Sequence, residues 1–345
     1  MTTQHLDPQN GDAEAPPSFW EIHSRQIFIV ALFVVIFFAV RLTLKPINVI
    51  DYGVRINAIH AFLNGQSPYT VDGFYEPPWC IFIILPLGGQ PLETWLALTV
   101  AFFVAETVDL GKPSGLVQLA HPLFITLLVS SNPEWIYLGP GLWLLYRTPK
   151  GWGRGLAWLF LTCKPQTTFF LLIFDGIAAL RQRDWKAFAL AGSAAVVSWF
   201  LFPDWIARLS IRMYVDWSGS VIYHYTVIGA IIVTVVILAI RWRRLGDLKT
   251  LGLILAPVWS PYTLEYSCVS LLFTLRKAGW LRNIVYLVCG LALVAVFWRD
   301  YHVSEHIAIL GMILLAAIFA PNNDLKPDEE TPAVEVNPQP IAEVS

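Results

Sequence analysis

Long apolar runs alternate along this chain with short polar or basic segments. The first run covers residues 27–44, and later runs include 188–202, 221–240, 281–298 and 306–320. An apolar helix of about 20 residues is long enough to cross a membrane. The pattern predicts an all-α polytopic transmembrane helix bundle with roughly ten to twelve membrane segments, several of them short.

The two ends of the chain differ in composition from the apolar part. Residues 1–24 are polar and lack the short apolar region and small-residue cleavage site of a signal peptide. Residues 321–345 combine acidic side chains with prolines, which is typical of a disordered tail. We therefore expect a disordered cytoplasmic N-terminus at 1–24, a polytopic membrane domain at 25–320 with its first external loop at 45–78, and a disordered acidic tail at 321–345.

Composition favours a membrane protein over a soluble one. The chain is 56% hydrophobic and 14% charged, with a mean hydropathy of +0.57, whereas soluble domains are about 25% charged. The net charge of −2 argues against a nucleic-acid partner, which requires a concentrated basic face. The four cysteines lie in apolar runs without C-x-x-C spacing, and we expect small buried side chains, with neither a disulfide framework nor a metal site. They are Cys80, Cys163, Cys268 and Cys289.

Basic residues gather in four short segments, at 147–154, 181–186, 241–249 and 276–282. The positive-inside rule places such segments in the cytoplasm, so the chain must cross the membrane an even number of times between them. Some of these intervals are too short for two full spans of about 20 residues. The sequence therefore predicts short half-helices that enter the membrane and return.

The clearest of these breaks is Lys164-Pro165. Proline interrupts the helical hydrogen bonds, and a lysine at membrane depth must face protein, water or an anion. Similar breaks are expected at 130–134 and 259–265. Polar, irregular backbone is tolerated in a membrane where it lines a cavity, so we expect the three breaks to share one non-cytoplasmic cavity beneath the loop that carries Asp51.

That loop and its flanks read IDYGVRINAIHAFLNGQSPYTVDGFYEPPWCIFIILPL from Ile50 to Leu87. Asp51 comes shortly after the first apolar run, and residues 56–63 have apolar side chains at helical spacing, which suits a helix lying along an interface. Asn64-Gly65 supplies turn chemistry, and a proline pair begins the next apolar run. The residues by themselves indicate an ordered loop at the membrane surface with an acid at its base.

The chain has an Asp after the first apolar run, a small amphipathic helix, G-x-S-P-Y, an aromatic residue near Pro-Pro and a later P-L. This combination resembles the polyprenyl-phosphate-sugar-dependent glycosyltransferases of the GT-C fold. Within them the chain is most similar to the bacterial mannosyltransferase-like family GT87, or DUF2029. That family commonly has Tyr-Pro-Pro, whereas Glu76 is inserted here to give Tyr75-Glu76-Pro77-Pro78. The segment GRGLAWLFLTCKP, which ends at Pro165, is also similar to the family pattern.

The resemblance implies transfer of a hexosyl group, usually mannose, from a polyprenyl-phosphate donor to a lipid or glycan acceptor. The reaction would occur at the outer face of the cytoplasmic membrane, among membrane lipids, with both termini in the cytoplasm. Asp51 holds the position of the family's catalytic acid and would deprotonate the acceptor hydroxyl. Lys164 and Arg55 would hold the donor phosphate. The other residues expected to line the cavity or bind substrate are Tyr69, Tyr75, Glu76, Glu134, Gln166, Ser260, Tyr262 and Glu265.

Each interpretation has an alternative. Asp51 would also suit a helix cap, Lys164 a side chain that reaches the interface, and the tyrosines an aromatic girdle. No metal ligands are assigned, and a divalent cation is left open as a helper of Asp51. The alternative function is a transporter or flippase of lipid-linked sugars, because broken helices and an intramembrane lysine suit that class as well.

Overall fold

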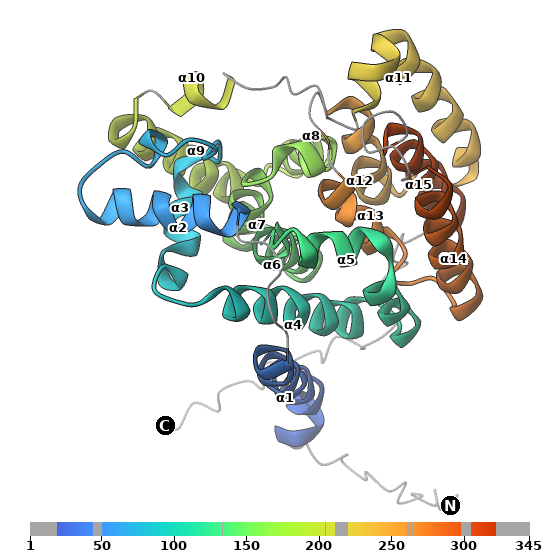
Figure 1. Ribbon diagram of the computed structural model, residues 1–345, viewed down its shortest axis with the longest axis horizontal. Coiled ribbons are helices and arrows are strands. Elements are labelled where there is room, and N and C mark those ends of the chain that lie inside the picture. Colours follow the sequence, from blue (N-terminus) through green and yellow to red (C-terminus); the bar gives the residue numbers. More distant parts are fainter. Residues whose placement is uncertain are drawn as a thin grey trace, which may run out of the picture.

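The computed structural model describes residues 19–43, 50–132, 134–203, 205–210, 220–260, 263, 265–297 and 305–321. Regular secondary structure in these residues is entirely helical, which confirms the all-α class (Figure 1). Helix α1 begins at Phe19, so residues 19–24, expected to be disordered, are helical. Residues 1–18 and 322–345 lie outside the described part, as does the disorder predicted for them.

The α-helices are α1 (Phe19–Thr43), α2 (Ile50–Leu63), α3 (Pro78–Ile84), α4 (Leu92–Leu110), α5 (Pro122–Val129), α6 (Glu134–Arg147), α7 (Gly151–Thr162), α8 (Pro165–Arg181), α9 (Trp185–Leu201), α10 (Trp205–Ser210), α11 (Val221–Ile240), α12 (Leu248–Trp259), α13 (Ser270–Thr274), α14 (Trp280–Phe297) and α15 (Glu305–Phe319). Short 3₁₀ helices include η1 (Pro68–Thr70), η2 (Leu85–Leu87), η3 (Pro113–Ala120) and η5 (Glu265–Val269).

Helices α2 and α3 lie at one side of the molecule and α11, α14 and α15 at the other, with α5 to α8 between them (Figure 1). A large hydrophobic core joins the central helices to α11–α15. A second, smaller core holds α2 and α3 against the rest, and includes Ile59, Phe74, Ile81, Trp95 and Tyr137. The polar face of α2 is thereby fixed over the starts of α6 and α8.

Helix α1 packs along α4. The Arg41 Nε atom donates a hydrogen bond to Thr94 Oγ1 at 3.0 Å, and Arg25 Nη2 donates to the Asp109 carbonyl oxygen at 2.7 Å. Because the end of α1 meets the start of α4, the two helices are antiparallel. The side of α1 that faces away from α4 is apolar and exposed, which suits contact with lipid.

Two helical stretches in the described residues are long and apolar enough to cross a membrane, His23–Thr43 and Trp280–Phe297. A third would be the pair Pro78–Leu87 and Leu92–Leu110, which bends by 106° at a short break. The other apolar stretches, which include His224–Ile240 within the kinked helix α11, are shorter than the about 20 residues of a full span. The described part therefore contains two or three candidate full-length spans, and the ten to twelve segments expected from the sequence, several of them short, are not confirmed.

The four basic segments of the sequence meet at one end of the structure. The Tyr146 ring is covered by Lys249 Nζ at 4.7 Å and by the Arg276 guanidinium at 4.2 Å, and Arg147 follows it directly. Arg154 Nη1 donates to Gln182 Oε1 at 3.0 Å, which brings the segment at 181–186 to the same end. The four basic segments therefore share one end of the structure, and their place on one side of a membrane stays a prediction.

Candidate functional site

The three sequence breaks come together at the opposite ends of these helices. The α7–α8 break carries Lys164, the α5–α6 break carries Glu134, and the segment after α12 carries Ser267. The Lys164 Nζ atom lies 3.3 Å from Glu134 Oε1, and Ser267 Oγ lies 3.5 Å from the same oxygen. Lys164 and Glu134, from two of the predicted breaks, therefore lie together, and Ser267 comes just after the third break, at 259–265.

Charged side chains from four segments form a compact group at this point, which we call the Lys164 cluster. Lys164 Nζ lies 3.4 Å from Glu76 Oε1 and 3.3 Å from Glu134 Oε1. Arg55 on α2 donates to Glu76 Oε1 from Nη2 at 2.6 Å and from Nε at 3.1 Å. The members are Asp51, Arg55, Glu76, Glu134 and Lys164.

Glu76, the residue inserted relative to the family pattern, is the centre of this group. Tyr137 donates its hydroxyl to Glu76 Oε2 at 2.8 Å, and the Tyr69 hydroxyl donates to the Glu76 carbonyl at 2.8 Å. Burial alone would raise the pKa of the Glu76 carboxyl, but the positive charges of Arg55 and Lys164, with the hydrogen bonds, outweigh it and lower that pKa. The carboxylate is therefore ionised and tightly held.

Asp51 lies in the first turn of α2 and is half-buried. Asn132 Nδ2 donates to Asp51 Oδ2 at 2.9 Å, and the Asn132 Oδ1 atom accepts from the backbone N–H of Glu134 at 3.1 Å. Arg55 Nη1 donates to the Asp51 carbonyl oxygen at 2.9 Å. Across the described part of the chain no other side chain donates a hydrogen bond to the Asp51 carboxylate.

The backbone beside Asn132 is held in an unusual conformation. Ser131 has a φ of 51°, in the left-handed region that costs energy for residues other than glycine. Its side chain is fully buried, and its hydroxyl has no hydrogen-bond partner among the residues that the structure describes. This conformation directs the neighbouring Asn132 amide toward Asp51.

Two of the expected site residues have a different setting from the one predicted. Arg55 is buried and paired with Glu76, so in this structure a protein carboxylate takes the place that we expected a donor phosphate to fill. Tyr75 donates its hydroxyl to Asp72 Oδ1 at 3.1 Å in the exposed part of the loop, and does not reach the Lys164 cluster. Arg55 and Glu76 are 21 residues apart, so their pairing depends on how the loop folds back, whereas Tyr75 bonds a near neighbour in the sequence.

The remaining candidates contribute less to the site. Gln166 is half-buried in the first turn of α8. Ser260 is buried at the end of α12, where its carbonyl accepts a hydrogen bond from the Ser220 hydroxyl. Tyr262 lies outside the described residues, and of Glu265 only the backbone is described, as the start of η5.

Three residues of the site were not predicted as site residues, namely Asn132, Tyr137 and Ser267. Asn132 was recognised only as part of a break between helices. Tyr137 lies three residues after Glu134, on the same face of α6, and that spacing was an available signal. Ser267 gave no local signal, since it reaches Glu134 from far along the chain.

The structure corrects the interpretation of two cysteines. Cys80 and Cys163 form a disulfide across a sequence separation of 83, with their Cα atoms 5.7 Å apart. Beside it, Trp79 Nε1 donates to the Leu159 carbonyl at 3.0 Å. The bond ties α3 to the end of α7, directly before Lys164. Without short Cys spacing the sequence held no signal for a bond between such distant positions.

Removing this disulfide should destabilise the protein. Replacing both Cys80 and Cys163 by serine should lower the free energy of unfolding by about 2–4 kcal/mol, because the unfolded chain regains the freedom of a long closed loop. The measurement is thermal or denaturant unfolding in detergent. The control is the double serine variant of Cys268 and Cys289, which are not disulfide-bonded. Equal unfolding midpoints for wild type and the Cys80/Cys163 variant would contradict the prediction.

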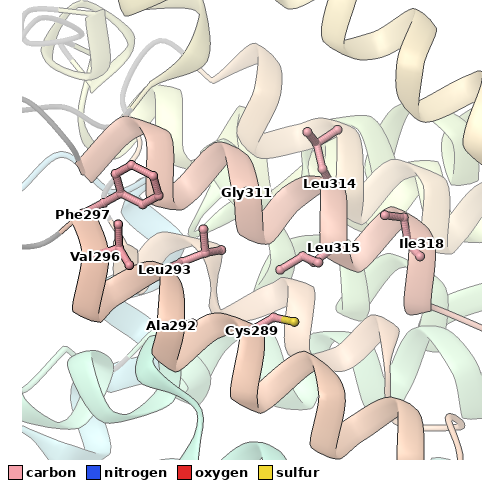
Figure 2. A pocket seen from close by; sticks show the side chains of 9 residues that line it. All are labelled: Cys289, Ala292, Leu293, Val296, Phe297, Gly311, Leu314, Leu315 and Ile318. Atoms are coloured by element: carbon pink, nitrogen blue, oxygen red, sulfur yellow. The ribbon is translucent and has the colours of Figure 1, made fainter.

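A separate groove of about 470 Å³ runs between α14 and α15. Figure 2 shows its lining, which is apolar throughout and includes Leu293, Phe297, Leu314 and Ile318. A groove without polar groups suits an acyl or isoprenoid chain but offers no group for catalysis. It is therefore not the candidate reaction site.

No group of three His, Cys, Asp or Glu side chains able to hold a metal ion occurs within the described ranges. Neither a family model, nor a curated protein, nor a solved structure matches this chain. The function is therefore inferred from the residues of the Lys164 cluster.

Proposed function

We propose that the protein is a membrane glycosyltransferase that transfers a hexosyl group, with mannose the first candidate, from a polyprenyl-phosphate donor to a lipid or glycan acceptor. The supporting observation is the joining of Asp51 and Lys164 through Asn132 and Glu134. A base and a cation in one group suit the two needs of this transfer, namely activation of a hydroxyl and stabilisation of a phosphate leaving group.

In the proposed reaction the acceptor oxygen forms a bond to the anomeric carbon of the sugar while the bond from that carbon to the phosphate oxygen breaks. The Asp51 carboxylate accepts the hydroxyl proton, and polyprenyl phosphate leaves with the electron pair. Lys164, whose side chain is 12% exposed, is the cation that the phosphate meets. Arg55 is buried and acts by holding Glu76 in place. No step is routed through a metal ion.

The proposed site faces the extracytoplasmic side of the cytoplasmic membrane. Two independent observations support this orientation: the basic segments gather at the other end, and the Cys80–Cys163 disulfide lies beside Lys164. Positive segments favour the cytoplasm, and disulfides persist in oxidising compartments. In this arrangement the shorter apolar helices complete a polytopic bundle with both termini in the cytoplasm, the short ones entering the membrane in part.

Transfer in proteoliposomes tests the proposal. Purified protein is given radiolabelled polyprenyl-phosphate-mannose and a native lipid extract, and labelled product is counted. Lys164→Met should lower transfer by about 10²–10³-fold, because a group that stabilises developing charge is lost. Lys150→Met, a matched change of an exposed lysine at the opposite end, should transfer like wild type.

Two other results would change the assignment. Equal transfer by wild type and Lys164→Met would remove Lys164 from the site. Movement of the labelled lipid across the vesicle membrane without any transfer would replace the enzyme by a transporter or flippase. Adding a chelator of divalent cations to the same vesicles decides whether a cation assists Asp51.

A further inference from the structure

Glu134 is the least satisfied charged group of the Lys164 cluster. Glu134 is 0% exposed. Its Oε1 atom has two partners at comparatively long distances, Lys164 Nζ at 3.3 Å and Ser267 Oγ at 3.5 Å. Its Oε2 atom is buried and has no hydrogen-bond partner among the described residues. A buried carboxylate in this state depends on one cation for its charge.

Glu76 is in the opposite condition, although it shares the same lysine. It keeps Arg55 at 2.6 Å and the Tyr137 hydroxyl at 2.8 Å whatever happens at Lys164. Charge-assisted hydrogen bonds are strongest at about 2.7–2.9 Å, so the contacts of Lys164 at 3.3 and 3.4 Å are comparatively weak. Lys164 is therefore the cation that can exchange partners. When it does so, Glu134 loses its positively charged partner.

The net charge of the Lys164 cluster determines how the cluster responds to a bound phosphodiester. The cluster holds three carboxylates, on Asp51, Glu76 and Glu134, against two cations, on Arg55 and Lys164. A phosphodiester bound at Lys164 adds a further negative charge to a group that already has an excess of one. Taking up one proton restores the original balance, and a buried carboxylate that loses its counter-charge favours the protonated form.

We infer that binding of a phosphodiester at Lys164 is coupled to uptake of one proton by the Glu134 carboxyl. The inference rests on the proposed function, because it takes the donor phosphate as the ligand of Lys164. In the free protein the Glu134 carboxylate pairs with Lys164 at the position that the phosphate would take. When the phosphate arrives, the proton neutralises Glu134 and frees the lysine. No covalent bond changes in this step.

Proton linkage makes donor binding depend on pH. Affinity should rise as the pH falls, by up to about tenfold per pH unit where Glu134 is ionised in the free protein and neutral in the complex. Weaker donor binding at high pH should therefore lower transfer at a fixed donor concentration.

Titration calorimetry in detergent tests the inference on the full chain. The probe is a short-chain prenyl methyl phosphodiester, which has no titratable proton near neutral pH, measured in two buffers of different ionisation enthalpy. Wild type should take up about one proton per ligand. Glu134→Gln should take up none and bind with an affinity that no longer changes with pH. Glu106→Gln, a buried acid hydrogen-bonded by Trp135 outside the cluster, should behave like wild type.

The wild-type measurement alone can overturn the inference, whether or not the variants fold. Phosphodiester binding with no proton uptake would overturn it and leave the proposed function standing. Uptake that persists in Glu134→Gln would assign the proton to another group. Absence of binding to wild type would overturn both the inference and the role of Lys164. Proton-linked binding without any sugar transfer would contradict the glycosyltransferase proposal but not the coupling of binding to proton uptake.

Discussion

Asp51→Asn should lower sugar transfer by about 10²–10⁴-fold, which is the usual contribution of a general base. The amide has nearly the shape of the carboxylate but cannot accept the proton of the acceptor hydroxyl. Asp51 does not touch Lys164 directly, and Asp51→Asn removes one negative charge from the Lys164 cluster, so phosphodiester binding should not be weakened. Initial transfer rates and calorimetric binding, measured on the same preparations, separate these two effects.

Asp72→Asn is the matched control for this change. Asp72 belongs to the same loop and is exposed, and its carboxylate accepts a hydrogen bond from Tyr75. Its replacement should leave transfer unchanged. If Asp51→Asn transfers sugar as fast as Asp72→Asn, then Asp51 is a structural residue of α2, and another group must take the proton.

Glu76→Leu should be the most destabilising single change at the site. It leaves the buried Arg55 guanidinium without its carboxylate, and breaking a buried ion pair on one side costs about 3–5 kcal/mol. The same substitution also removes the acceptor of the Tyr137 hydroxyl. The free energy of unfolding in detergent measures the loss.

The double variant Arg55→Met with Glu76→Leu is the informative comparison. Removing both charges avoids the uncompensated guanidinium, so the double variant should be more stable than Glu76→Leu. A double variant that is as unstable as the sum of the two single changes would show that Arg55 and Glu76 contribute independently, against the pairing in the structure.

The Glu76 contribution should also depend on pH. Because the folded structure lowers the pKa of this carboxyl, its contribution is fully present above the unfolded value of about 4.3. As the pH falls below that value toward the lower folded pKa, the contribution is lost. The difference in unfolding free energy between wild type and Glu76→Leu should therefore shrink in acid. A constant difference down to pH 3 would contradict the ionised state assigned to Glu76.

Local features of the sequence were enough for many helices. The apolar run at 221–240 is α11 with the same bounds, and the run at 281–298 is α14 displaced by one residue. The Lys164-Pro165 break also appears where it was expected, with Pro165 as the first residue of α8. These outcomes follow from hydrophobic periodicity and from the missing N–H of proline, which act over a few residues.

The sequence predicted only some of the residues that form the site. Lys164, Glu76 and Glu134 attract notice in the sequence because charged residues next to apolar runs are costly unless they have partners. The sequence did not indicate which residues those partners are. Arg55 was expected to meet a phosphate and instead pairs with Glu76, whose loop folds back over α2.

The sequence by itself determined the helical class, the apolar character and the positions of the polar breaks, because each depends on residues within one or two helical turns. Only the tertiary structure decided that the breaks meet, that Asn132 holds Asp51 and that Cys80 bonds Cys163. Contacts between distant segments depend on how the helices pack together, and the residues on either side of each contact carry no local mark of their partner.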